Sequence, residues 1–309
     1  MRDQLDHLPQ STQRELAHVV RVLFEEFEAA LRPGTSKWSK QGRILKIVLY
    51  GSFARGDWVS DPIGGYVSDY NILIVVNDER LTDFEFWSAA EDRLMRDVTI
   101  SNLLTAPVSF IAHTLTDVNA QLERGRPFFV DIVGQGIALY EAEGFAFANP
   151  RILPVDEAVA EAKTHFEFWF AQASSAKMGA EFFISAKKPR DAAFLFHQAA
   201  ERAYHCALLS ITLYSPKSHR LNFLRSQCEQ IAPVLADAWP RGAKFERRCF
   251  ELLRQAYVSA RYSALYTVTG EELTWTAEHV ALLLSLVESL CRNHLADLVR
   301  GPQAQPGQF

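Results

Sequence analysis

A glycine–serine turn between two largely apolar runs constrains how the first half of this chain can fold. Residues 44–50 read ILKIVLY and lead directly into Gly51-Ser52, while a second apolar run begins just after Asp69. Short apolar runs bounded by turn residues are typical of buried strands. Glycine carries no Cβ and accepts positive φ, so the turn lets the main chain approach a ligand closely. Residues i and i+2 of a strand share a face, which places Asp69 and Asn71 on one side of the second strand.

Strands and helices alternate through the rest of the first half. Thr12 and Glu15 form a capping-box pattern at the start of a first helix, and Pro33-Gly34 ends it. The long gap between Ser52 and Asp69 predicts an extra hairpin or loop at 58–67. Other expected elements are strands at 44–50, 70–76, 107–113 and 136–140 and helices at 84–96, 116–124 and 127–133. We therefore expect a mixed sheet with helices over residues 1–141.

Linker composition, rich in Gly, Pro and Asn, marks residues 142–154. After it, helical periodicity replaces strand patterns, with helices expected at 155–185, 190–213, 221–231, 245–262 and 271–298. Short polar joints between them favour an antiparallel bundle over 155–299, and we expect the tail at 300–309 to be disordered. The predicted fold class is α+β: a mixed sheet with helices, followed by an all-α helical bundle.

Composition excludes several classes of protein. The chain is 48% hydrophobic and 22% charged, as soluble globular proteins are. The start lacks the apolar core of a signal peptide, and no stretch reaches the ~18 apolar residues of a membrane span, so we expect a cytoplasmic protein. Residues 1–150 carry 14 Lys and Arg against 21 Asp and Glu, which argues against wrapping DNA. The four cysteines lack CxxC spacing and are expected to be buried thiols.

Two motifs in register carry a family resemblance. The strand followed by GSFARG at 51–56, with SDYN opening the next strand at 68–71, resembles the minimal nucleotidyltransferases of the polymerase-β-like superfamily over roughly residues 35–141. The helical half, with text such as LFHQAAERAY at 195–204, resembles a HEPN domain over roughly 155–299. The order of the two matches nucleotidyltransferase/HEPN fusions and, more distantly, kanamycin-type nucleotidyltransferases.

The resemblance implies transfer of a nucleoside monophosphate from a nucleoside triphosphate to a hydroxyl, on Mg²⁺ (or Mn²⁺) ions held by three carboxylates. Gly51 and Ser52 would then cradle the phosphates. Asp69 would be the first metal ligand, with Asn71 at the second position and Ser109 at the third.

Asn71 and Ser109 depart from the family pattern, because an amide or hydroxyl oxygen can ligate a metal but supplies no charge. The metal that activates the acceptor depends chiefly on protein carboxylates, so we expect nucleotide binding to survive better than transfer. Asp131 would replace a missing carboxylate only if its helix faces the site; a structural role is the alternative.

Positive groups give further candidate nucleotide contacts. Arg55 lies within the glycine–serine motif, and Arg247, Arg254 and Arg261 recur every seven residues with Tyr257 near the same stripe. Guanidinium groups and an aromatic ring on one helix face suit a phosphate and a stacked base. A solvated or salt-bridged face is the alternative.

Histidines in the helical half allow two other interpretations. His197, Glu201 and His205 share one helix face at i, i+4 and i+8, a spacing that suits zinc, but no fourth ligand is visible and we favour a hydrogen-bonded face inside the bundle. Arg190 and His197 fit the Arg-x4-6-His spacing of HEPN ribonucleases but lie too early in the bundle. The late segment 254–262 has no histidine, so we do not expect ribonuclease activity.

The leading hypothesis is a protein that binds Mg²⁺–nucleoside triphosphate and transfers its nucleotidyl group weakly. The alternatives are a non-catalytic nucleotide- or RNA-binding regulator of toxin–antitoxin type and a homodimeric scaffold. Protein tyrosine, an RNA end and small hydroxylated molecules all remain open as acceptors. We expect a homodimer through the helices at 245–262 and 271–298.

Overall fold

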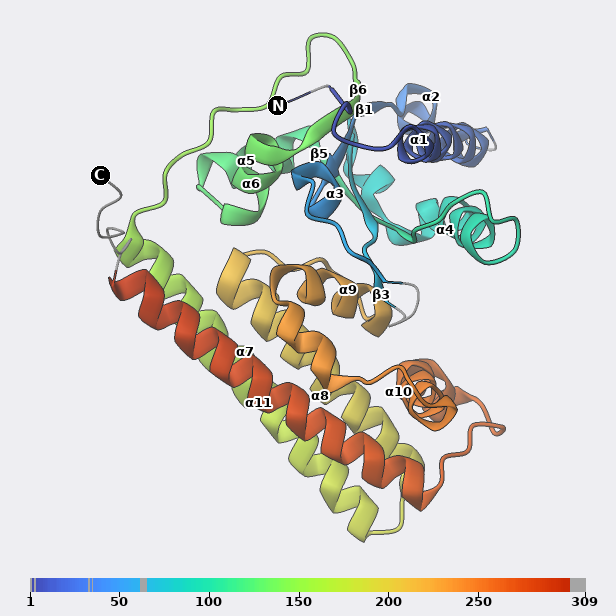
Figure 1. The fold of residues 1–309 in the computed structure, drawn as a ribbon, viewed down its shortest axis with the longest axis vertical. Helices are drawn as coiled ribbons and strands as arrows, with labels where there is room; N and C mark the ends of the chain where they lie inside the picture. The colour runs from blue at the N-terminus through green and yellow to red at the C-terminus, as the bar shows by residue number, and fades with distance from the viewer. Residues whose placement is uncertain (1, 3, 33, 35, 62–65, 301–309) are drawn as a thin grey trace. The chain divides into compact units, whose positions relative to one another are not determined.

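The computed structural model describes residues 2, 4–32, 34, 36–61 and 66–300. The chain divides into two compact units, Met1–Ile152 and Leu153–Phe309 (Figure 1), each with its own hydrophobic core. The first unit is a mixed sheet with helices and the second is helical. The predicted α+β fold class is therefore confirmed. Residues 301–309 of the expected tail lie outside the described part of the chain.

A four-stranded sheet organises the first unit, in the order β5-β4-β1-β6. β1 (Ile44–Tyr50) pairs antiparallel with β4 (Tyr70–Val76) and with β6 (Ile137–Glu141), while β4 and β5 (Val108–Thr114) are parallel. Every residue of β1 and β4 is buried. Burial of the two central strands on both faces explains why their sequences read as nearly continuous apolar runs.

Helices cover both faces of this sheet (Figure 1). α1 (Gln10–Leu31) and α4 (Phe84–Thr99) pack on one face, where Ile72 and Ile74 enter the core cluster. α5 (Leu115–Glu123) and α6 (Pro127–Gln135) cover the other. Asn71 belongs to this second face, because side chains alternate along a strand.

Short elements complete the first unit: α2 (Lys37–Gln41), α3 (Ser52–Arg55) and the 3₁₀ turn η1 (Glu79–Thr82). β2 (Ser60–Asp61) and β3 (Tyr66–Val67) pair antiparallel between the glycine turn and β4, as the long gap predicts. The connection at 62–65 lies outside the described residues.

The predicted capping box at the start of α1 is wrong. The helix begins at Gln10, before Thr12, and Pro9 precedes it with no side-chain cap. Glu15 is buried and accepts hydrogen bonds from the Tyr70 hydroxyl at 3.0 Å and the Thr105 amide at 2.8 Å. Glu15 therefore connects α1 to the sheet, because tertiary partners replace the local cap that its spacing from Thr12 suggests. Pro33 of the predicted stop signal is outside the described residues.

The second unit contains α7 (Val155–Ser185), α8 (Pro189–Thr212), α9 (Leu221–Ile231), η2 (Pro233–Ala238), α10 (Lys244–Tyr262) and α11 (Gly270–Arg300). α8 is central and packs against α7, α9, α10 and α11. Its buried face is rich in alanine, which lets neighbouring helices lie close. All four cysteines of the chain are buried free thiols in this unit, as predicted.

None of the described helices combines the length and the apolar character needed to cross a membrane.

Candidate functional site

The turn after β1 requires glycine. Gly51 has φ 76° and ψ −153°, a region essentially restricted to glycine. Its carbonyl accepts from the Arg55 amide at 3.0 Å, and the Ser52 carbonyl accepts from the Gly56 amide at 2.8 Å. The chain therefore reverses sharply at the end of β1, and this reversal fixes the position of Ser52.

The Ser52 hydroxyl has no hydrogen-bond partner within the described part of the chain, although the residue is only 8% exposed. A buried hydroxyl without a partner costs about 1–3 kcal/mol. Such a group in a native structure calls for an explanation, and a ligand oxygen is one that suits a glycine turn.

Asp69, Asn71 and Ser109 come together beside this turn. Asn71 pairs with Tyr50 across the β1–β4 ladder and with Ser109 across the β4–β5 ladder. The Ser109 hydroxyl donates to Asp69 Oδ2 at 2.7 Å, and the Asn71 amide donates to the Asp69 carbonyl at 3.0 Å. The three predicted site residues thus form one cluster at the end of the sheet where β1 enters the glycine turn.

This cluster does not fit a pair of metal ions held by protein carboxylates. It contains one carboxylate, and no group of three His, Cys, Asp or Glu among the described residues can hold a metal ion. The carboxylate of Asp69 already accepts a hydrogen bond from Ser109. What the arrangement retains is one charged ligand and two neutral oxygen groups, which suits an ion whose other ligands come from a substrate.

Arg55 is close to carboxylates. Its Nε donates to Asp57 Oδ2 at 3.1 Å. Burial raises the pKa of Asp131 on α6, and the nearby Arg55 opposes part of that rise. Phe128 of the same helix packs edge-on against Tyr50, with ring centroids 5.6 Å apart. α6 therefore faces the end of β1, although Asp131 does not complete a set of acidic metal ligands.

Two N-terminal residues contact the main chain of α3, and no sequence pattern signals them. Arg2 Nη2 donates to the Ala54 carbonyl at 2.7 Å, and His7 Nε2 lies 2.9 Å from the Phe53 carbonyl. Contacts from a side chain to a main-chain group some 50 residues away depend on the tertiary fold, so periodicity and spacing carry no trace of them.

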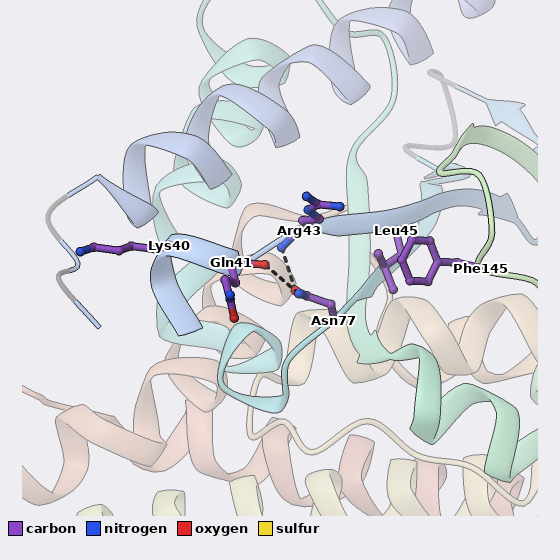
Figure 2. Close-up of a pocket in the computed structure, with 6 residues that line it drawn as sticks. All are labelled: Lys40, Gln41, Arg43, Leu45, Asn77 and Phe145. Atoms are coloured by element: carbon purple, nitrogen blue, oxygen red, sulfur yellow. Dashed lines mark hydrogen bonds between the residues drawn. The ribbon is translucent and has the colours of Figure 1, made fainter. Parts of the chain in front are cut away.

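A pocket of about 380 Å³ opens at the other end of β1 (Figure 2). Asn77 crosses it, accepting from the Arg43 amide at 2.7 Å and donating to the Gln41 carbonyl at 2.8 Å. The Lys40 side chain points away from these groups (Figure 2). None of the predicted site residues lines the pocket. The side-chain amide of Asn77 already makes hydrogen bonds to main-chain groups, so it is not available to a ligand. Its lining residues are Lys40, Gln41, Arg43, Leu45, Asn77 and Phe145.

The arginine stripe of α10 is occupied by contacts within the helical unit. Arg254 bonds Glu251 at 2.7 Å and lowers the pKa of that carboxyl. Arg261 lies 4.4 Å from the centre of the Tyr257 ring and donates to the Tyr257 carbonyl at 2.6 Å. Arg247 donates to main-chain carbonyls at 2.7 and 2.8 Å. These contacts favour the salt-bridged alternative for Arg254, while Arg247 binds main-chain carbonyls before α10 and Tyr257 and Arg261 form a stacked pair.

The histidine face of α8 is not a zinc site. His205 Nδ1 lies 2.6 Å from the Ser215 hydroxyl, and burial lowers the His205 pKa to about 4. Glu201 Oε1 lies 2.9 Å from Nδ1 of His219, a residue that sequence reasoning missed. Burial lowers the pKa of His197 to about 3, and His219 and Arg261 add to the shift. No metal-binding group is present here among the described residues.

Arg190 does not pair with His197. Its guanidinium donates to the Ala260 carbonyl at 2.9 Å and the Ser263 carbonyl at 2.7 Å, where it fixes the end of α10. These main-chain contacts give Arg190 a structural role. The Arg-x4-6-His spacing of Arg190 and His197 therefore does not correspond to a pair of side chains that act together.

Comparison with known families identifies the helical unit. Residues 166–291 match the HEPN domain, a range that lies within α7 to α11. The predicted HEPN domain is thereby confirmed, and the match does not extend to the first unit. No curated protein matches the chain.

Proposed function

We propose that this HEPN-containing protein binds a nucleoside triphosphate with Mg²⁺ (or Mn²⁺) in its first unit and transfers the nucleotidyl group weakly to a hydroxyl acceptor. The observation that carries the proposal is the partnerless buried hydroxyl of Ser52 at the Gly51 turn. It lies where β1 ends, beside the strand position that carries Asn71 and near Asp69. A phosphate oxygen would satisfy that hydroxyl, and main-chain amides of the turn would support it.

The metal ligands that the site offers should support triphosphate binding better than nucleotidyl transfer. Asp69 would ligate the metal ion that arrives with the triphosphate, because phosphate oxygens supply most of that ion's ligands. Activating the acceptor hydroxyl needs a second, protein-held ion, and Asn71 and Ser109 bring no charge to hold one. We therefore expect measurable triphosphate binding and slow transfer. Protein tyrosine, an RNA end and small hydroxylated molecules form the acceptor panel.

The decisive experiment removes the Ser52 hydroxyl and the glycine at position 51. Ser52→Ala alone, and combined with Gly51→Val, should weaken binding of a non-hydrolysable triphosphate at least tenfold, about 1.4 kcal/mol, in calorimetry with Mg²⁺. Gly144→Val is the matched control, since Gly144 also has positive φ (88°) but has open space where a Cβ would project. Unchanged affinity in folded Ser52 variants would place the nucleotide elsewhere.

A second candidate function is a non-catalytic nucleotide- or RNA-binding regulator of toxin–antitoxin type. Two observations favour it: the hydrogen bond from Ser109 that occupies the Asp69 carboxylate, and the HEPN domain itself. Pyrophosphate release in the presence of the acceptor panel separates the two functions, because a regulator would bind the triphosphate and release none. A pure scaffold would fail the nucleotide titration as well.

The helical unit adds candidate contacts for a nucleotide or RNA. Tyr257 offers an aromatic ring and Arg261 a cation beside it. Arg254 lies on the same helix but is paired with Glu251, so it would contact a phosphate only by leaving that carboxylate. Stacking on an aromatic ring together with guanidinium contacts to phosphate is a common way of holding a base and its backbone. We expect the double variant Arg254→Ala, Arg261→Ala to weaken nucleotide or RNA binding and reduce its salt dependence.

A further inference from the structure

The helical unit contains a buried histidine with unsatisfied nitrogens. His197 on α8 is 0% exposed, and neither ring nitrogen makes a hydrogen bond within the described part of the chain. Glu201 Oε2, one turn along the helix, lies 3.6 Å from Nδ1, beyond hydrogen-bond distance. Buried polar atoms are nearly always paired in native proteins, so two open nitrogens on one ring mark a place where a further group belongs.

His219 covers this place from the outside. It lies on the segment between α8 and α9, and its side chain is 62% exposed. Even so, its ring stacks on Tyr257 with centroids 4.9 Å apart and planes 11° apart. Its Nδ1 lies 2.9 Å from Glu201 Oε1. A carboxylate can only accept, so this nitrogen carries the proton. An exposed planar ring thus donates an N–H to a buried carboxylate while lying flat on an aromatic ring.

We propose that the His219 ring occupies a binding site for a guanine base and that displacement of His219 opens this site. The site comprises the Tyr257 ring as stacking surface, the Glu201 carboxylate as acceptor and the Arg261 guanidinium, 4.4 Å from the Tyr257 ring centre, as cation for a phosphate. The ring centre of His197 lies 5.3 Å from that of Tyr257, so this buried imidazole packs against the inner side of the site.

Guanine fits the carboxylate better than the other bases do. Its N1–H and 2-amino group are adjacent donors, and an ionised carboxylate offers two acceptor oxygens. Glu201 Oε1 takes the His219 donor, while Oε2 has a longer contact of 3.2 Å from Gln198. Adenine places the acceptor N1 beside its amino group, which would face a carboxylate oxygen unfavourably. Hypoxanthine lacks the 2-amino donor. A site built on paired donors therefore discriminates against both.

The inference extends the nucleotide surface proposed for α10 but does not depend on transfer chemistry in the first unit. It also explains why Glu201, only 6% exposed as a residue, relies on an exposed imidazole as partner. Because His219 competes for the same acceptor and the same ring, the wild-type protein binds the base weakly. Removing the imidazole is expected to strengthen binding, the opposite of what loss of a true contact would do.

The test uses the full chain and calorimetric titration with GMP, IMP and AMP. His219→Ala should bind GMP at least about tenfold more tightly than wild type, the scale of one base stacked on an aromatic ring. GMP should exceed IMP and AMP by a similar factor. Adding Tyr257→Leu, which keeps an apolar side chain, should abolish the gain. His165→Ala is the matched control, a histidine on α7 that lies 3.6 Å from a glutamate.

The outcomes separate the possibilities. Failure of His219→Ala to gain affinity, or an equal gain for AMP, would overturn the proposal. A gain that survives Tyr257→Leu would also overturn it. A guanine-containing RNA pentanucleotide, titrated in parallel, tells a free nucleotide from a base within RNA, because a site for RNA would favour the oligomer. Ser52→Ala should weaken triphosphate binding in the first unit and leave GMP binding by His219→Ala intact, so failure of either proposal is visible without the other.

Discussion

At the scale of single residues, polar groups on the sheet face define what the first unit can do. The cluster of Asp69, Asn71 and Ser109 is held by two hydrogen bonds, and one of them occupies the carboxylate. Asn71 is fully buried. A neutral amide suits that environment, because a buried carboxylate at position 71 would repel the half-buried Asp69 unless a cation joined them.

Asn71→Asp is therefore expected to raise affinity for divalent metal, since it restores a negative charge beside Asp69. Calorimetry with Mn²⁺ and a non-hydrolysable triphosphate measures the effect. The same variant should be less stable than wild type without metal. Asn77→Asp, at the other end of the same strand, is the matched control and should leave metal affinity unchanged. No gain in Asn71→Asp would show that residue 71 does not face the metal.

His197 gives a prediction on pH. Burial lowers its pKa from the ordinary value of 6.5 to about 3 in the folded protein. Between these values the unfolded chain binds a proton that the folded one does not, so stability falls as the pH decreases below about 6.5. His219, Arg261 and Glu201 face the ring, and the first two add to the shift by repelling its charge.

Replacing this histidine should flatten the acid limb of the stability curve. His197→Gln is expected to reduce the slope of unfolding free energy with pH between 6 and 4 by up to about 1.4 kcal/mol per pH unit, the value for one proton. Urea unfolding followed by circular dichroism at several pH values measures this slope. His165→Ala, at a half-buried site, should retain the wild-type slope; an identical slope in both variants would contradict the assignment.

At the scale of elements, local signals and tertiary contacts account for different parts of the structure. β1, β4 and α9 begin and end where apolar periodicity predicts, because long apolar or amphipathic runs leave few alternatives. The start of α1 differs from the prediction, because the Glu15 carboxylate accepts hydrogen bonds from Tyr70 and Thr105 instead of capping the helix. The stacking of His219 on Tyr257 and the contacts of Arg2 likewise depend on the assembled fold, which spacing along the chain cannot reveal.

Glu15 should matter to stability as a link between elements. Burial and the nearby Glu15 carboxylate raise the pKa of Tyr70, so the phenol remains a donor to Glu15. Glu15→Ala leaves both Tyr70 and the Thr105 amide without this acceptor and is expected to destabilise the first unit by about 2–3 kcal/mol in chemical denaturation. Glu28→Ala, an exposed position on the same helix, should change stability little. Equal effects of the two substitutions would show that the contacts of Glu15 with Tyr70 and Thr105 add little to stability.

At the scale of the whole molecule, the homodimer through 245–262 and 271–298 stays a prediction, and α7 offers a different surface on which two copies could pair. Large apolar side chains on α7 are exposed: Phe168 by 57%, Met178 by 63% and Phe182 by 64%. With Ala171 and Ser175 they are spaced alternately by three and four residues, like the a and d positions of a coiled coil, so all five lie on one face of α7. Phe168 and Phe182 are equidistant from Ser175, so two antiparallel copies would meet self-complementarily about that residue.

A dimer through this seam should dissociate when charge is placed in it. Phe182→Glu is expected to give a monomer by light scattering, because an unpaired carboxylate at an apolar interface is costly. Leu265→Glu is the contrasting variant, at a residue 90% exposed just beyond α10. Dissociation by Leu265→Glu alone would favour the end of the bundle as the interface, and a monomeric wild type would remove the dimer altogether.

The location of the cysteines means that a thiol reagent can label the second unit but not the first. Cys206, Cys228, Cys249 and Cys291 are all buried in the second unit, and the first unit has none. Burial raises the pKa of Cys249 to about 11, which further suppresses thiolate formation while the helices are closed. A thiol reagent therefore labels the native chain slowly and reports opening of the HEPN unit alone. The rate of thiol labelling therefore measures local unfolding of the second unit and gives no signal for opening of the first.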